Sequence, residues 1–181
     1  FDGGQFILSR GNGTILTSST GTNWTLRPTP TTSFLMSVAH YPGGLAAVGE
    51  RGVILTSTNA GLDWTAQVSG TTNWLTQVRW LNARLVAVGQ NGTILTSMDG
   101  RNWSPSASGT AAWLNASDYI AGEWFVAGNQ GTVLGSANAT NWTSFGTLTR
   151  KSLYGLSIHE GQLVTVGSEG VVIRSQLVPD A

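Results

Sequence analysis

Short apolar runs alternate with polar, glycine-containing turns along the whole chain, and no long stretch carries the 3.6-residue period of an amphipathic helix. One representative unit predicts four strands, at residues 74–80, 84–89, 93–97 and 102–105. The second strand contains a continuous apolar run at 85–88, which is typical of a strand covered on both faces. The pattern therefore predicts an all-β protein built from short strands.

Three landmarks recur along the chain, each at intervals of 39 or 40 residues. They are the glycine before each third strand, the tryptophan after the following polar turn, and the leucine near the start of each first strand. The glycines are Gly13, Gly52, Gly92, Gly131 and Gly170; the tryptophans are Trp24, Trp64, Trp103 and Trp142; the leucines are Leu35, Leu75, Leu114 and Leu153. Periods of about 40 residues filled with short strands are typical of propeller blades with about four strands each. We therefore predict a β-propeller.

The repeat divides the chain into blades of a single propeller domain that spans residues 1–181. The predicted blades are 31–69, 70–108 and 109–147, with partial blades at 1–30 and 148–181. Five blades, of which the first and last are incomplete, are favoured. In the alternative, four blades form when the strand at Trp24 completes the last unit, and an extra hairpin is left over. Because incomplete sheets expose strand edges, we expect ring closure or a homo-oligomer formed through edge strands.

The turns between second and third strands carry a hairpin signal. Asn91-Gly92 and Asn12-Gly13 each place two residues that tolerate positive φ at adjacent positions. We therefore predict tight two-residue turns at these points.

The polar turn before each tryptophan resembles the Asp-box, or bacterial neuraminidase repeat, whose pattern is Ser-x-Asp-x-Gly-x-Thr-Trp. The copy from Ser57 to Trp64 has Asn59 in place of the acid, and the copy at 97–103 keeps the acid but is one residue shorter. The copies at 18–24 and 136–142 are also short and lack the acid. The resemblance extends to sialidase-like and photosystem II assembly factor-like propellers. It implies a propeller in which these turns lie on the outer rim, opposite the ligand face.

The chemistry of this turn also indicates a structural role. A short Asp or Asn side chain accepts hydrogen bonds from the backbone amides that follow it, and glycine takes the strained dihedral angle. We expect the tryptophan to insert between adjacent sheets, so the repeated tryptophans are predicted to be structural.

Composition excludes several classes of function. Nine acidic and nine basic residues cancel, which argues against a nucleic-acid partner. Lys151 is the single lysine, and no apolar run is long enough to cross a bilayer, so we expect no membrane insertion. The absence of cysteine removes disulfides and thiolate metal sites. A polar, uncharged composition with eight tryptophans and 24 glycines is common in secreted bacterial repeat proteins, so we expect a secreted or cell-surface bacterial protein.

No catalytic set stands out. The resemblance implies that a sialidase would need an arginine triad and a tyrosine nucleophile. No residues of this sequence match either of them. Glu50 and Glu169 occupy equivalent turns and would face one another across a central channel, as glycosidase carboxylates do, but solvated turn carboxylates are the favoured interpretation. His40 and His159 have no acidic neighbours at metal-ligand spacing. We therefore expect no enzyme activity, no metal and no cofactor.

The candidate ligand-binding face is formed by loops that cluster at one end of a propeller. The loops into first strands supply aromatic residues, and the turns between second and third strands supply polar ones. The candidates are Phe34, Trp74, Trp113, Glu50, Arg51, Gln90, Asn91, Asn129, Gln130 and Glu169. Aromatic rings beside amide groups suit a sugar or a peptide, although the rings could instead be core between blades.

We therefore predict a non-catalytic extracellular binding or adhesion propeller that recognises a glycan or a protein through this face. Two alternatives remain. One is a structural subunit that self-assembles through its incomplete end blades, and the other is a protein-docking assembly factor.

Overall fold

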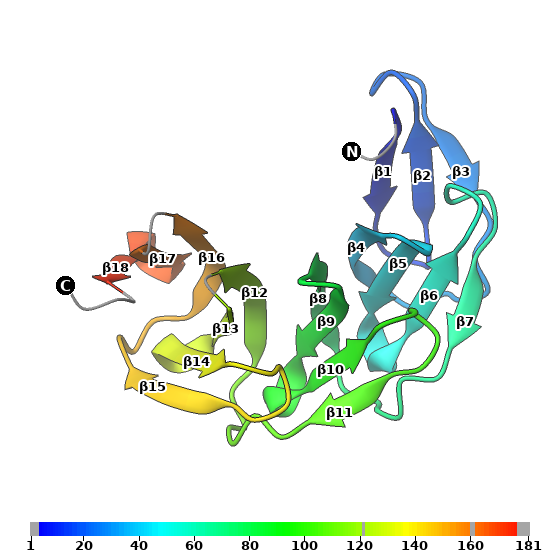
Figure 1. Ribbon diagram of the computed structural model, residues 1–181. Helices are drawn as coiled ribbons and strands as arrows, with labels where there is room; N and C mark the ends of the chain where they lie inside the picture. The colour runs from blue at the N-terminus through cyan, green and yellow to red at the C-terminus, as the bar shows by residue number, and fades with distance from the viewer. Residues whose placement is uncertain (1–3, 121, 160–161, 177–181) are drawn as a thin grey trace. The chain divides into compact units, whose positions relative to one another are not determined.

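The computed structural model of the chain describes residues 4–120, 122–159 and 162–176. These residues form 18 short β-strands in five antiparallel sheets, and their helical elements are four 3₁₀ turns (Figure 1). The prediction of an all-β, five-bladed propeller is confirmed.

The sheets follow one another along the chain, and each strand pairs with its sequence neighbour. Sheet 1 consists of β1 (Phe6–Ser9), β2 (Ile15–Ser18) and β3 (Thr25–Arg27). Sheet 2 consists of β4 (Leu35–Tyr41), β5 (Gly44–Gly49), β6 (Ile54–Ser57) and β7 (Thr65–Gln67). Sheet 3 consists of β8 (Leu75–Leu81), β9 (Arg84–Gly89), β10 (Ile94–Ser97) and β11 (Ser104–Ser106). Sheet 4 consists of β12 (Leu114–Ile120), β13 (Glu123–Gly128), β14 (Thr132–Ser136) and β15 (Thr143–Thr147), and sheet 5 of β16 (Leu153–His159), β17 (Gln162–Gly167) and β18 (Val172–Gln176).

The pairing of β3 decides between the two blade arrangements. β3 pairs with β2 in the register Ile15↔Arg27, so the strand after Trp24 belongs to sheet 1. The four-blade alternative, in which this strand completes the last unit, is therefore wrong. Residues 177–181, at the end of the partial blade predicted at 148–181, lie outside the described residues.

Contacts divide the chain into two compact units. The first comprises Phe1–Ala87 and Leu95–Ser104, and the second comprises Val88–Ile94 and Pro105–Ala181.

Apolar clusters between consecutive sheets form the core of each unit. In the first unit, one cluster joins sheets 1 and 2 through Ile15, Leu35, Leu45, Ala47, Leu55 and Trp64. Another joins sheets 2 and 3 through Tyr41, Ala46, Val48, Ile54, Leu75, Val78, Leu85, Ala87 and Leu95. In the second unit, sheets 4 and 5 meet through Ala116, Phe125, Ala127, Val133, Leu153, Leu156 and Leu163. Because neighbouring residues of a strand point to opposite faces, the second strands of sheets 2, 3 and 4 carry continuous apolar, buried runs at 45–48, 85–88 and 124–127.

The repeated tryptophans differ in burial. Trp64 is 7% exposed and packs in the cluster between sheets 1 and 2. Trp24 is 39% exposed, which corrects the expectation that every copy inserts between two sheets. The reason lies within the first unit: Trp64 packs toward sheet 1, which precedes it, and no described sheet of the first unit precedes sheet 1.

The polar turn at 97–103 holds its shape through side-chain to backbone hydrogen bonds. Ser97 Oγ accepts from the Gly100 amide at 2.9 Å. Asp99 Oδ1 accepts from the amides of Arg101 and Asn102 at 2.9 and 2.8 Å. Trp103 Nε1 then donates to the Gly100 carbonyl at 2.9 Å. The predicted turn chemistry is therefore present, and Trp103 belongs to the turn rather than to the fourth strand, which starts at Ser104.

The fourth copy of the turn departs from this arrangement. Ala139 stands where the other copies have glycine, and its carbonyl accepts from Ser106 Oγ at 2.8 Å. Trp142 Nε1 has no hydrogen-bond partner among the described residues. In this copy, a contact from β11 is present and the indole bond of the turn is absent.

Acid is expected to weaken the turn at Asp99. The amides of Asn102 and Arg101 hold the pKa of this carboxyl well below its ordinary value of 3.8. A carboxyl whose pKa is lower in the folded state stabilises the fold above its unfolded pKa, and this contribution is lost as the pH falls below about 3.8. We expect Asp99→Asn to lower the melting temperature at pH 7, and the difference from wild type to shrink steadily as the pH falls below 4. A difference that stays constant across this range would contradict the argument.

Candidate functional site

Four tight turns join the second and third strands of sheets 2 to 5. They are η1 (Glu50–Gly52), η2 (Gln90–Gly92), η3 (Asn129–Gly131) and η4 (Ser168–Gly170). The central residues lie in the left-handed region, with φ of 56° for Arg51, 53° for Asn91, 56° for Gln130 and 55° for Glu169. The glycine that follows each one also has positive φ. The positive φ predicted at Asn91-Gly92 and Asn12-Gly13 is therefore confirmed. The prediction of two-residue turns is wrong, because β9 ends at Gly89 and β10 begins at Ile94, and Ser9 pairs with Ile15.

Backbone hydrogen bonds fasten each turn to the loops beside it. In three sheets, the first residue of the turn donates its amide at 2.8 Å to the residue before the first strand: Glu50 to Phe34, Asn129 to Trp113, and Ser168 to Ser152. The turn glycine Gly92 donates to Ala112, in the loop that leads to the next sheet, also at 2.8 Å. Turns and loops therefore meet at the same end of the strands.

In the second unit these segments surround a hollow of about 480 Å³, which we call the amide hollow. Its lining residues are Gln90, Asn91, Thr110, Ala111, Ala112, Trp113, Asn129 and Gln130. Five of the ten candidates from the sequence are among them: two from η2, two from η3, and the tryptophan that precedes β12. No lining side chain is titratable.

A neighbouring amide sets the orientation of Asn129. Asn115 Nδ2 donates to the Leu153 carbonyl at 2.8 Å and to Asn129 Oδ1 at 2.9 Å. Because the bond to a carbonyl requires a donor, the orientation of the Asn115 amide is settled, and Asn129 must present its oxygen to it. The Nδ2 group of Asn129 is therefore left without a partner among the described residues and is available to a ligand.

The first unit has a smaller hollow of about 370 Å³ around Phe34. Arg10, Gly11, Asn12 and Thr14 complete its lining. A Cβ atom on Gly11 would lie 2.9 Å from the Phe34 ring, so the ring rests directly on the backbone there. Phe34 is exposed. It is therefore not a core residue between blades, which was the other interpretation left open for the aromatic candidates.

The carboxylate of Glu50 is engaged within its own turn region. Its Oε2 accepts from the Phe34 amide at 3.3 Å, and its Oε1 lies 3.8 Å from Nε of the exposed Arg51. Ser168 occupies the equivalent position in sheet 5, and its Oγ accepts from the Ser152 amide at 3.1 Å. In sheets 2 and 5, the side chain at this turn position therefore accepts a hydrogen bond from the backbone amide just before the first strand.

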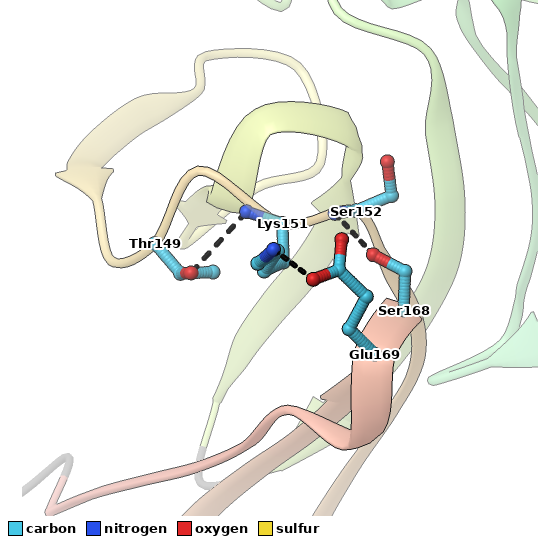
Figure 2. Close-up of polar contacts among 5 residues, drawn as sticks. All are labelled: Thr149, Lys151, Ser152, Ser168 and Glu169. Carbon is cyan, nitrogen blue, oxygen red and sulfur yellow. Dashed lines mark hydrogen bonds and ion pairs between the residues drawn. The ribbon is translucent and has the colours of Figure 1, made fainter.

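Glu169 forms an ion pair with Lys151 across the neighbouring loop (Figure 2). The Lys151 amide in turn donates to Thr149 Oγ1 at 3.2 Å. Both charged side chains are solvated, and the pair is neutral overall, so this corner adds little net charge to the second unit. Glu50 lies in the first unit and Glu169 in the second.

Trp74 is half-buried and precedes β8 in the first unit. The ten candidates are thus divided between the units, with Phe34, Trp74, Glu50 and Arg51 in the first and the other six in the second.

Sequence reasoning missed several residues of these hollows. Thr110, Ala111 and Ala112 carry no chemistry that marks a site, although their place in a loop between a fourth and a first strand was a signal. Arg10 and Thr14 flank the Asn12-Gly13 turn, and the equivalence of that turn with η2 would have pointed to them.

The described residues contain no group of three or more His, Cys, Asp or Glu side chains placed to hold a metal ion. They also contain no helix with the length and apolar character that a membrane span requires.

No protein-family model matches the sequence, and no curated protein matches it. Solved structures do match. YCF48 bound to D1 peptide is 19% identical with a TM-score of 0.71, and the match covers 94% of this chain and 60% of that one. YCF48 from Cyanidioschyzon merolae is 14% identical with a TM-score of 0.70, with coverage of 93% and 65%. The WD40 β-propeller domain of Doa1 is 14% identical with a TM-score of 0.75, with coverage of 97% and 62%.

These similarities concern the fold. The chain spans about 60–65% of the length of the three structures. YCF48 is a photosystem II assembly factor, so the expected resemblance to propellers of that kind is confirmed for the fold. The chain is thus similar to known β-propellers in architecture.

Proposed function

We propose that the protein is a non-catalytic binding module whose amide hollow holds an extended segment of another protein. The observation that carries the proposal is the convergence of Gln90, Asn91, Trp113, Asn129 and Gln130 around one hollow of about 480 Å³.

The lining suits the chemistry of a peptide backbone. Each peptide unit offers one N–H donor and one C=O acceptor, and a side-chain amide offers both in return. Asn129 has its Nδ2 donor available, and the exposed side chain of Gln130 has no hydrogen-bond partner among the described residues. Trp113 adds an apolar ring on which a side chain of the ligand can pack.

Backbone strain at Gln130 supports a role for its side chain. A left-handed conformation costs a residue other than glycine about 1–2 kcal/mol, and Asn or Asp less. Gln130 has φ of 56°, where glycine or asparagine would relieve the strain. A strained residue that offers its amide to a hollow is typical of a binding position.

The same lining argues for binding rather than catalysis. General acid–base and most nucleophilic catalysis require a titratable or activated side chain in reach of the substrate. The residues that line the amide hollow are amides, alanines, one threonine and one tryptophan. The structure of YCF48 bound to D1 peptide supports a peptide as the class of ligand, since that protein has the same architecture.

The proposal predicts that a substitution in the amide hollow can weaken peptide binding without lowering the stability of the fold. Peptides selected from a random display library with the folded protein are expected to bind. Trp113→Ala should weaken their binding by about 30-fold or more, as expected for a central aromatic contact of at least about 2 kcal/mol. Gln130→Gly should weaken it by about 2- to 12-fold, the value of one hydrogen bond, while the melting temperature stays the same or rises. Calorimetric titration and thermal melts measure the two quantities.

Phe34→Ala is the matched control, because Phe34 occupies the position equivalent to Trp113 but lines the hollow of the first unit. Its affinity for the selected peptides should equal that of wild type. A display selection that yields no peptide, or peptides whose affinity is unchanged in both variants of the amide hollow, would refute the proposal.

A glycan is the second candidate ligand, and the Trp113 ring is the observation that favours it. The apolar face of a sugar packs on such a ring while amides bind its hydroxyls. A glycan array screened beside the peptide library separates the two classes. Binding to the array that Trp113→Ala abolishes, with no peptide selected, would favour this alternative.

A further inference from the structure

The walls of the amide hollow are formed by two turns and a loop. Residues of η2 and η3 line two sides, and the loop before β12 supplies residues 110–113, so no lining residue lies in a strand. The Gly92 amide donates to the Ala112 carbonyl at 2.8 Å, and the Ala112 amide donates to Thr110 Oγ1 at 3.1 Å. Strand addition requires a continuous edge of unpaired backbone groups. The hollow has no such edge, so its ligand is recognised by side chains.

The side chain of Asn129 offers the hollow a donor. Its Oδ1 already accepts from Asn115 Nδ2 at 2.9 Å, and the Asn115 amide is itself fixed by its bond to the Leu153 carbonyl. The open group is therefore Asn129 Nδ2, which can only donate. The part of a ligand that lies against Asn129 must be a hydrogen-bond acceptor.

The charge of the lining indicates which acceptor fits. The residues that line the hollow are all uncharged, so no cation is present there to neutralise an anion. A carboxylate that loses its water without a cationic partner costs far more free energy than a neutral amide does. The acceptor is therefore better supplied by a backbone carbonyl than by an acidic side chain or a chain terminus.

The polyproline II conformation presents carbonyls in the required way. This helix has no internal hydrogen bonds, so every carbonyl is open to a donor. Proline also lacks the backbone N–H, so a segment that contains it brings fewer donors that the hollow would have to satisfy. Its φ is fixed before binding, which lowers the entropy that binding costs.

Trp113 supplies the apolar partner for a proline ring. The side chain is half-buried and lines the same hollow as Asn129. The Asn129 amide donates to the Trp113 carbonyl at 2.8 Å, so the two residues are neighbours although they belong to different elements. Grooves that combine an aromatic ring with hydrogen-bond donors are the usual sites for proline-rich segments.

We propose that the segment held by the amide hollow contains proline in the polyproline II conformation. The pyrrolidine ring packs on Trp113, and a carbonyl beside it accepts a hydrogen bond from Asn129 Nδ2. This inference rests on the proposed function, since it names the class of peptide that the same hollow binds.

Two matched display libraries test the proposal with the folded full chain. Their peptides have the same random positions and differ only in the central residue, which is proline in one library and alanine in the other. Binders are expected from the proline library. Replacing the central proline of a selected peptide by alanine should weaken its binding about fivefold or more, because both the ring contact and the preset φ are lost.

Asn129→Asp tests the donor. The new carboxylate still accepts from Asn115 Nδ2, so the melting temperature should stay close to that of wild type, but it has no N–H for the ligand. The affinity for selected proline peptides should fall at least about tenfold. Asn12→Asp is the matched control, because it adds the same charge to a turn that lines the hollow of the first unit. Its affinity should equal that of wild type.

The outcomes separate this inference from the proposed function. Peptides that Trp113→Ala weakens, but that come equally from both libraries or bind Asn129→Asp as tightly as wild type, would overturn the inference and leave the proposed function standing. If neither library yields a binder, both are refuted.

Discussion

Replacing Trp64 by alanine is expected to lower the free energy of unfolding by about 3–5 kcal/mol, the usual cost of removing a large buried aromatic side chain. The indole is 7% exposed and packs between sheets 1 and 2 with Ile15 and Leu45. Its Nε1 also donates to the Gly61 carbonyl at 3.1 Å, so the substitution removes both apolar packing and a bond that closes the turn. Urea unfolding monitored by circular dichroism measures the change.

Trp24→Ala is the matched control for this substitution. Trp24 has the same bond, from Nε1 to the Gly21 carbonyl at 3.1 Å, but its side chain is 39% exposed. Its loss should therefore cost clearly less than that of Trp64. Equal costs for the two substitutions would show that the turn bond, and not burial between sheets, determines the contribution of the tryptophan.

Gly92→Ala is expected to cost about 2–4 kcal/mol, from the strain of a left-handed backbone and from overpacking. Gly92 has φ of 66°, and a Cβ atom there would lie 2.0 Å from the Thr110 carbonyl oxygen. Its amide also donates to Ala112, so a backbone shift that relieved the contact would disturb this bond and the wall of the amide hollow. Chemical denaturation gives the stability change.

Gly109→Ala separates the two causes. Gly109 has φ of 72°, close to that of Gly92, but no atom lies within 4 Å of the position its Cβ would take. It should therefore show only the conformational part of the cost, about 1–2 kcal/mol. If the two substitutions proved equally costly, contact with the loop at Thr110 would not matter, and the fit between turn and loop described above would be wrong.

The amide hollow shows how far a repeat can differ in function while its backbone stays constant. Arg51, Asn91, Gln130 and Glu169 occupy the same left-handed position, with φ between 53° and 56°. The equivalent turns therefore offer a cation, two amides and an anion from one backbone geometry. Variation at this position changes the surface without changing the fold, as expected of binding residues placed on the loops of a rigid scaffold.

Much of the candidate site could be predicted because turn chemistry is local. The Asn91-Gly92 pair marked a turn with positive φ, and the repeat placed Gln130 in an equivalent turn. The separation of Phe34 from Trp113 could not be predicted, since both precede a first strand and differ only in the loops that surround them. The orientation of Asn129 depends on Asn115 and Leu153, which come from two different sheets.

The strands, their order and the positive φ of the turn residues follow from the sequence, because these depend on neighbours a few residues apart and on a period that repeats them. Which copies of a repeated residue are buried depends on the packing of whole sheets. Trp24 and Trp64 follow similar polar turns, yet one is exposed and the other is core. The difference arises because burial requires a second sheet to cover the side chain, and no residue of the repeat itself records whether that sheet is present.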